Sequence, residues 1–156
     1  MVDAGKMVKR IQEMREDGYL SDAILRAVVK EIRSSDTKCD WVGAYLLNPE
    51  EGVLWLHNYV GPSTEHARIP VGEGVCGTAV VEKKNQNVPD VTKVENYLAC
   101  NPRVKAEMVV LIRAGDEIFG QLDIDSNTMN AFTTEDQETV ELVAEKLAEV
   151  FMAEQH

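Results

Sequence analysis

The sequence predicts an α+β fold in which an antiparallel sheet of about six strands is flanked by N- and C-terminal helices. Segments with apolar residues at helical spacing lie near both ends of the 156-residue chain. Between them, runs rich in branched apolar and aromatic residues form two pairs, and a short turn joins the members of each pair. Two hairpins between helices are typical of an antiparallel sheet packed on helices.

Two helices are expected before the first strand. Residues 3–17 place apolar side chains at helical spacing until Asp17-Gly18 interrupt the pattern, and a second helix opens at Ser21. The apolar stripes of these helices consist of Met7, Ile11 and Met14, and of Ile24, Val28 and Ile32.

The first hairpin is expected at WVGAYLLN (41–48) and VLWLHNYVG (53–61), which are joined by a turn at 49–52. A short strand at 67–70 then leads into a glycine-rich loop. A helix should follow this loop and run over about 75–84.

Residues 85–105 are predicted mostly as loop, and loops of that length in compact domains are often functional. The segment 106–126 gives a second hairpin around a turn at 114–116. Thr133, three residues before Asp136, is the expected N-cap of a final helix. The apolar face of that helix consists of Val140, Val143, Leu147, Val150 and Phe151.

The composition argues against several function classes. The chain has 16 Lys and Arg against 27 Asp and Glu, a net charge of -11, and no basic run that could follow a phosphate backbone. Nucleic acid is therefore not an expected partner. No apolar stretch approaches a membrane span, and the N-terminus lacks the apolar core of a signal peptide. We expect a single soluble, cytoplasmic domain over residues 1–156, with no membrane partner.

Two carboxylates share one face of the last predicted strand. In GQLDIDS, strand alternation puts Leu122 and Ile124 on one face and Asp123 and Asp125 on the other. Like charges so close are costly unless the face is solvated or binds a cation, and the residues leave both interpretations open. Glu107 joins them if the hairpin register allows. Such a cluster suits an ammonium group; a metal is not expected, since no EF-hand spacing or nearby histidine accompanies it.

Three cysteines, Cys39, Cys76 and Cys100, are too few for a disulfide scaffold and form no zinc motif. Cys76, in GEGVCG, lies where a loop becomes a helix, and a helix start can favour ionisation of a thiol. The alternative is a small buried side chain. Cys100 lies in the long predicted loop, where a structural role is less expected, and Cys39 in a polar run is interpreted as incidental.

Two aromatic residues of the first strand, Trp41 and Tyr45, are separated by four positions and so share a face. Most aromatic pairs of this kind belong to a core. Beside an acidic cluster, however, they would form a box for a positively charged or polarised small molecule.

An ordered set of motifs resembles a known family. WVGAY, GEGVCGTA, VPDV, YLAC, AEMVV and GQLDIDS, in this order, resemble the GAF domain of the free methionine-(R)-sulfoxide reductases. The resemblance covers about residues 19–152. It implies a GAF-like fold, reduction of free L-methionine (R)-S-oxide to methionine, and no metal or organic cofactor.

The resemblance also implies how the cysteines act. It implies that Cys100 is the nucleophile that becomes a sulfenic acid and Cys76 the residue that resolves it as a disulfide, or the reverse. A thioredoxin-type dithiol would then reduce this disulfide. Two departures from the family pattern affect this scheme: His66 stands where members commonly carry a third cysteine, and Asn101-Pro102 follow the loop cysteine where Asp-Ser is more usual.

The same resemblance implies a substrate site. Glu107, Asp123 and Asp125 would bind the substrate's ammonium group, and a protonated member would donate to the sulfoxide oxygen. Trp41 and Tyr45 would pack on the S-methyl end.

A second function class stays open at this point. GAF domains are mostly small-molecule sensors, and a chain lacking one family cysteine could be a non-catalytic binding module that acts through a partner. No kinase, cyclase or DNA-binding segment accompanies the domain in this sequence, which we interpret as favouring the enzyme. The oligomeric state is also open, because the amphipathic end helices could pack on each other or form the seam of a homodimer.

Overall fold

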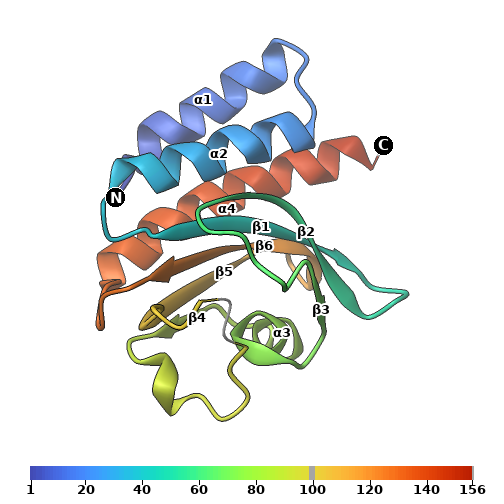
Figure 1. Cartoon of the computed structure of the whole chain (residues 1–156). Helices are drawn as coiled ribbons and strands as arrows, with labels where there is room; N and C mark the ends of the chain where they lie inside the picture. Colours follow the sequence, from blue (N-terminus) through green and yellow to red (C-terminus); the bar gives the residue numbers. More distant parts are fainter. Residues whose placement is uncertain (99–100, 156) are drawn as a thin grey trace.

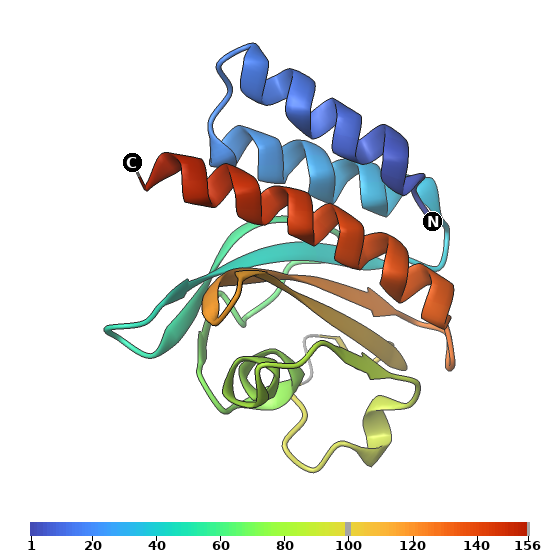
Figure 2. The ribbon, with the colours of Figure 1, turned by 180° about the vertical axis from the view of Figure 1, so that it is seen from behind.

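The computed structural model describes residues 1–98 and 101–155. Helices α2 and α4 cover one face of a six-stranded antiparallel sheet, and α1 packs on these two helices (Figures 1 and 2). Helix α3 and the loops around it cover the opposite face. The α+β architecture and the number of strands expected from the sequence are therefore confirmed.

The helices begin and end close to their predicted limits. Helices α1 (Ala4–Glu16) and α2 (Ser21–Ser35) precede the sheet, and α4 (Thr134–Glu154) follows it. Met7 and Ile11 of α1 are buried in the same apolar cluster as the inner face of α4. The two end helices thus pack on each other within one chain, and the homodimer stays a prediction.

The strands follow the predicted hairpins. The sheet order is β3-β2-β1-β6-β5-β4, so the two hairpins meet where β1 pairs with β6. The strands are β1 (Trp41–Asn48), β2 (Val53–Val60), β3 (Arg68–Pro70), β4 (Gln86–Val88), β5 (Ala106–Ala114) and β6 (Glu117–Ser126).

The segment predicted as a long loop contains two short elements. Residues of β4 pair with β5 at the sheet edge, and a 3-10 turn, η1 (Val91–Lys93), follows. Three residues are too few to show a strand periodicity, so no pattern in the sequence predicts β4. Helix α3 spans Gly74–Glu82. Its C-cap is Lys83, whose φ of 55° lies in the left-handed region.

Alternation along β6 divides the sheet into two different environments. Leu122 and Ile124 lie in the apolar cluster beneath α2 and α4, as expected. Asp123 and Asp125 point to the other face, which a second apolar cluster around Trp41, Tyr45 and other residues shares. The helix-covered face therefore holds the main core, and the α3 face holds the polar groups.

Helix α4 begins with a reciprocal cap. The Thr133 hydroxyl accepts a hydrogen bond from Asp136 N at 3.0 Å, while the Thr133 N–H donates to the Asp136 carboxylate at 2.9 Å. That carboxylate also pairs with the ammonium group of Lys38. Thr133 is thus the N-cap that the sequence predicts, with Asp136 completing a capping box.

None of the helices in the described ranges combines the length and apolar content that crossing a bilayer requires.

Replacing Thr133 by Ala removes the acceptor for Asp136 N, so we expect the free energy of unfolding to fall by about 1 kcal/mol. Chemical denaturation would measure this change. The Thr134→Ala variant, whose exposed side chain follows the cap, is the matched control. Equal losses in both variants would show that the hydroxyl of Thr133 does not stabilise the helix.

Candidate active site

The strand register brings the predicted carboxylates together. In the β5–β6 hairpin Glu107 lies directly opposite Asp125, while in the β1–β6 pair Trp41 also lies opposite Asp125. Asp123 is two residues away on the same face. Adjacent strands therefore place all three acidic residues around one point.

This acidic face is buried. Glu107 is 6% exposed, and Asp123 and Asp125 are each 2% exposed. The interpretation as a solvated sheet face is therefore wrong, because α3 and its neighbouring loops cover the face. The elements that bury this face lie elsewhere in the chain. Alternation along the strand therefore could not predict the burial.

Burial changes the protonation of the two aspartates. It raises the pKa of Asp123, although hydrogen bonding to Glu107 and Cys76 opposes the shift. It raises the pKa of Asp125 further, and the neighbouring charge of Asp123 adds to the effect. Among the described residues, neither aspartate forms an ion pair with a lysine or arginine. Burial therefore favours the protonated form of these carboxyl groups over the charged one, and a cation that entered would oppose this effect.

Cys76 lies in the first turn of α3, against the same cluster. Its side chain is 4% exposed, and its Sγ lies 3.8 Å from Glu107 Oε2. Burial raises the pKa of the Cys76 thiol well above its ordinary value, and the charges of Asp123 and Glu107 raise it further. The expectation that the helix start eases ionisation is therefore wrong, because lost hydration and nearby carboxylates outweigh the helix dipole.

Gln121 is a site residue that the sequence analysis missed. Its fully buried side chain reaches from β6 to α3, where Nε2 donates a 3.0 Å hydrogen bond to the Cys76 carbonyl. This bond fixes the turn that carries the thiol. Gln121 lies two residues before Asp123 on the same strand face, so period-two alternation was an available signal for it.

The aromatic pair forms an apolar wall on the sheet face that carries the acidic cluster. Trp41 and Tyr45 are buried on the same sheet face with ring centroids 6.4 Å apart, and Trp41 also stacks on Tyr59. The Tyr45 hydroxyl donates to the carbonyl oxygen of His66 at 2.8 Å. The half-buried His66 thus contributes its backbone to the position of this wall.

Gly43 determines where the Trp41 ring can lie. A Cβ atom at Gly43 would be 2.3 Å from Trp41 Cη2, a separation that side-chain atoms do not tolerate. The ring therefore occupies the space above Gly43, which itself lies opposite Asp123. A glycine within a strand often marks such a close approach, and this was the signal in the sequence.

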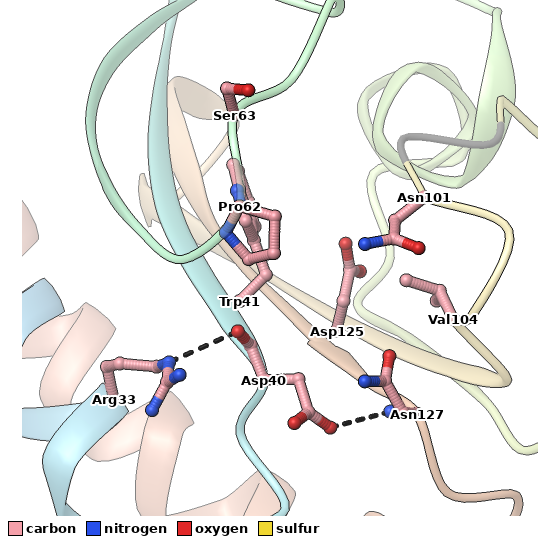
Figure 3. Close-up of a pocket in the computed structure, with 9 residues that line it drawn as sticks. All are labelled: Arg33, Asp40, Trp41, Pro62, Ser63, Asn101, Val104, Asp125 and Asn127. Carbon is pink, nitrogen blue, oxygen red and sulfur yellow. Dashed lines mark hydrogen bonds between the residues drawn. The ribbon is translucent and has the colours of Figure 1, made fainter.

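A pocket of about 120 Å³ opens beside Asp125. Figure 3 shows the carboxylate of Asp125 between Trp41 and Asn101. Two hydrogen bonds order the opposite rim: Arg33 Nε donates to the Asp40 carbonyl oxygen at 3.1 Å, and Asn127 N donates to Asp40 Oδ2 at 2.7 Å. The lining residues are Arg33, Asp40, Trp41, Pro62, Ser63, Asn101, Val104, Asp125 and Asn127.

A second, inner cavity of about 10 Å³ lies against Cys76, Glu107 and Asp123. Leu98 closes one side of it. Such a volume is close to that needed for a single water molecule.

Cys100, the predicted nucleophile, lies outside the described residues. The described residues nearest to it in sequence contact the two cavities: Leu98 lines the inner cavity, and Asn101 lines the outer pocket. Cys39 is buried in the main core on the other sheet face, away from the acidic cluster.

Comparison with known proteins identifies the fold family, because the model of the GAF domain matches residues 21–151. The chain belongs to the GAF domain family. The free methionine-R-sulfoxide reductase of Escherichia coli K12 is 37% identical to this GAF domain over 114 residues, which are 73% of this chain and 67% of the relative.

Solved structures give the same result. The free methionine-R-sulfoxide reductase of Neisseria meningitidis, in complex with its substrate, matches this GAF domain with a TM-score of 0.89 and 26% identity, over 99% of this chain and 94% of the other. The reduced form of the Staphylococcus aureus enzyme matches with a TM-score of 0.84 and 32% identity, over 96% of each chain. These matches confirm the family and the enzyme class to which the sequence motifs pointed.

Replacing Gly43 by Ala should displace the Trp41 ring and lower the free energy of unfolding by about 1–3 kcal/mol. In a Trp55→Phe background, near-ultraviolet circular dichroism would report the loss of the Trp41–Tyr59 stack. Gly115→Ala is the control. Its Cβ strains a left-handed turn but meets open space, so the aromatic spectrum should not change. An unchanged aromatic spectrum in Gly43→Ala would contradict this packing.

Replacing Asp123 by Asn removes the nearby charge that most strongly opposes ionisation of Cys76. We expect the pKa of the thiol to fall while remaining above its ordinary value, because burial persists. Thiolate absorbance against pH would measure it in a background without Cys39 and Cys100. Asp116→Asn, in the exposed β5–β6 turn, should leave the pKa unchanged. A rise in Asp123→Asn would contradict the assigned cause.

Proposed function

We propose that this chain reduces free L-methionine (R)-S-oxide to methionine by thiol chemistry. The observation that carries the proposal is the buried group of Glu107, Asp123 and Asp125 beside an aromatic wall and a cysteine. Reductases of this name share its fold and more than a quarter of its sequence. The family resemblance alone would leave the chemistry open, since GAF domains serve several functions.

The carboxylates would bind the substrate's ammonium group. Asp123 Oδ1 and Asp125 Oδ1 are buried and lack hydrogen-bond partners within the described residues. Buried acceptors of this kind are costly to leave unpaired, and an alkylammonium offers three donors and a compensating positive charge. A free amino acid carries such a group, whereas a methionine within a protein chain does not.

The same cluster would supply a proton. Burial raises the pKa of both Asp123 and Asp125 and so favours a protonated carboxyl group in the cluster. A carboxylic acid held in this way can donate to the sulfoxide oxygen as charge develops on it. Trp41 and Tyr45 would meanwhile pack on the S-methyl end, as buried apolar surface close to the acidic residues.

The redox step is proposed to involve both cysteines. The thiolate of Cys100 attacks the substrate sulfur and forms a sulfur–sulfur bond, while the sulfoxide oxygen takes up a proton. The oxygen then moves to the Cys100 sulfur as the sulfur–sulfur bond and the substrate's sulfur–oxygen bond break, which releases methionine and leaves a sulfenic acid. The substrate sulfur gains two electrons and Cys100 loses two. The thiol of Cys76 then displaces water from the sulfenic acid and forms a disulfide, which requires the two Cα atoms to approach within about 6 Å.

The environment of Cys76 supports its assignment as the resolving residue. Burial and neighbouring carboxylates raise its pKa, so it is a poor first nucleophile at neutral pH. Cys76 would act second, on the sulfenic acid that Cys100 has formed. With Cys76 as the resolving residue, the reaction needs no third cysteine. His66, at the position of the family's third cysteine, therefore does not prevent turnover.

A thioredoxin-type dithiol is proposed to reduce the Cys76–Cys100 disulfide by exchange, which returns both thiols and completes the electron balance. Such a reductant places the reaction in the cytoplasm, where dithiol systems operate.

The test supplies free L-methionine (R)-sulfoxide, thioredoxin, thioredoxin reductase and NADPH to the purified protein, and NADPH loss is followed. We expect turnover with the (R)-epimer only. Cys100→Ser should lose it, while Cys39→Ser, altered in the distant core, should retain it. Cys76→Ser should form about one methionine per chain and stop as a trappable sulfenic acid.

Each other outcome has a definite meaning. A single turnover in Cys100→Ser and none in Cys76→Ser would reverse the cysteine roles. Absence of turnover in the unaltered protein, with a chemical dithiol also failing, would overturn the enzymatic proposal and favour a binding module.

A further inference from the structure

Cys76, Glu107 and Asp123 form a cluster whose donor atoms could share one ligand. One donor atom from each residue, the Cys76 Sγ and a carboxylate oxygen of each acid, lies within 4.8 Å of the others. The three residues come from α3, β5 and β6, and all are buried. Because regular elements hold each residue, the three donor atoms are already close to one another before any ligand arrives.

A second observation indicates that the cluster can accept a cation. One oxygen of Asp123 and one of Asp125 are buried without a hydrogen-bond partner in residues 1–98 and 101–155. Asp125 directs its carboxylate toward the outer pocket, as Figure 3 shows. Buried carboxylates are normally paired with a cation or coordinate a metal. The same group therefore accepts positive charge from whichever ligand reaches it.

The inner cavity is the right size for an ion. Its volume of about 10 Å³ is near that of one water molecule and far below that of the outer pocket. Tetrahedral zinc has bonds of about 2.3 Å to sulfur and about 2.0 Å to oxygen, which places these ligand atoms about 3.5 Å apart. The Cys76 Sγ and Glu107 Oε2 are already 3.8 Å apart.

We propose that this GAF domain binds one Zn²⁺ through Cys76 Sγ, Glu107 and Asp123. A thiolate among the ligands selects zinc over magnesium or calcium, which prefer all-oxygen sites. Binding displaces the thiol proton and compensates the buried negative charge. A water molecule completes the tetrahedron.

Zinc at this position would regulate the reductase, an inference that rests on the proposed function. The ion would occupy the resolving thiol and two of the carboxylates intended for the ammonium group. Substrate and zinc would therefore exclude each other. Release of zinc from the site would restore activity without a change in the fold.

The binding test uses Co²⁺, which replaces zinc and is coloured. The full chain is reduced, freed of metals with a chelator and titrated with Co²⁺. We expect one equivalent to produce a thiolate-to-cobalt charge-transfer band and the intense visible bands of four-coordination, and Zn²⁺ to displace both. Competition with a chromophoric chelator then gives the Zn²⁺ dissociation constant.

Variants assign the ligands. Cys76→Ser should abolish the charge-transfer band, and Asp123→Asn should weaken Zn²⁺ binding by about 100-fold or more, since even indirect metal contacts are worth 10–100-fold. Cys39→Ser and Cys100→Ser should retain the band. Circular dichroism checks that each variant is folded. A missing band in the unaltered protein, or one that persists in Cys76→Ser, would overturn the proposal.

An activity measurement distinguishes failure of the zinc proposal from failure of the proposed reductase function. If the unaltered protein reduces methionine sulfoxide, Zn²⁺ should inhibit it and added substrate should relieve the inhibition. Co²⁺ bands without any turnover would contradict the reductase while upholding the metal site. Turnover that is insensitive to Zn²⁺ at concentrations where the bands saturate would overturn the regulatory role.

Discussion

Placing Glu107, Asp123 and Asp125 together on a buried sheet face costs free energy, since like charges repel and each loses its hydration. The fold offsets this cost on the other face of the sheet, where α2 and α4 cover a large apolar cluster and α1 packs on α4. The acidic group therefore remains near its neighbours with part of its hydrogen-bonding capacity unused. Unused capacity of this kind is what a cationic ligand can exploit.

The same electrostatic constraint differentiates the cysteines. Cys39 and Cys76 are both buried, and the pKa of each is raised, that of Cys39 to about 11. Of these two described cysteines, Cys76 faces the carboxylates of the site, whereas Cys39 lies in the main core. A cysteine at the start of a helix is thus not activated by that position alone. Its reactivity depends on the balance between the helix dipole and the charges that the tertiary structure brings near.

Local patterns predicted much of this molecule and failed where distant elements meet. Alternation in GQLDIDS correctly separated the core residues from the acidic ones, and the hairpin register placed Glu107 with them. Burial of the acidic face was not predictable, because α3 and the loops that cover it come from elsewhere in the chain. Alternation was a signal for Gln121, and a glycine within a strand was a signal at Gly43. The partners that they meet, the Cys76 carbonyl and the Trp41 ring, are determined only in the assembled sheet.

Strand β6 shows what this division implies for variation in the sequence. In its second half, Leu122 and Ile124 lie in the apolar cluster beneath the helices, so their replacement is limited by shape and volume. The residues that alternate with them, Gln121, Asp123 and Asp125, are limited by charge and by donor and acceptor geometry. Adjacent residues of β6 are thus under independent constraints. Substitutions at the polar positions can change which ligand binds without disturbing the core beneath the helices.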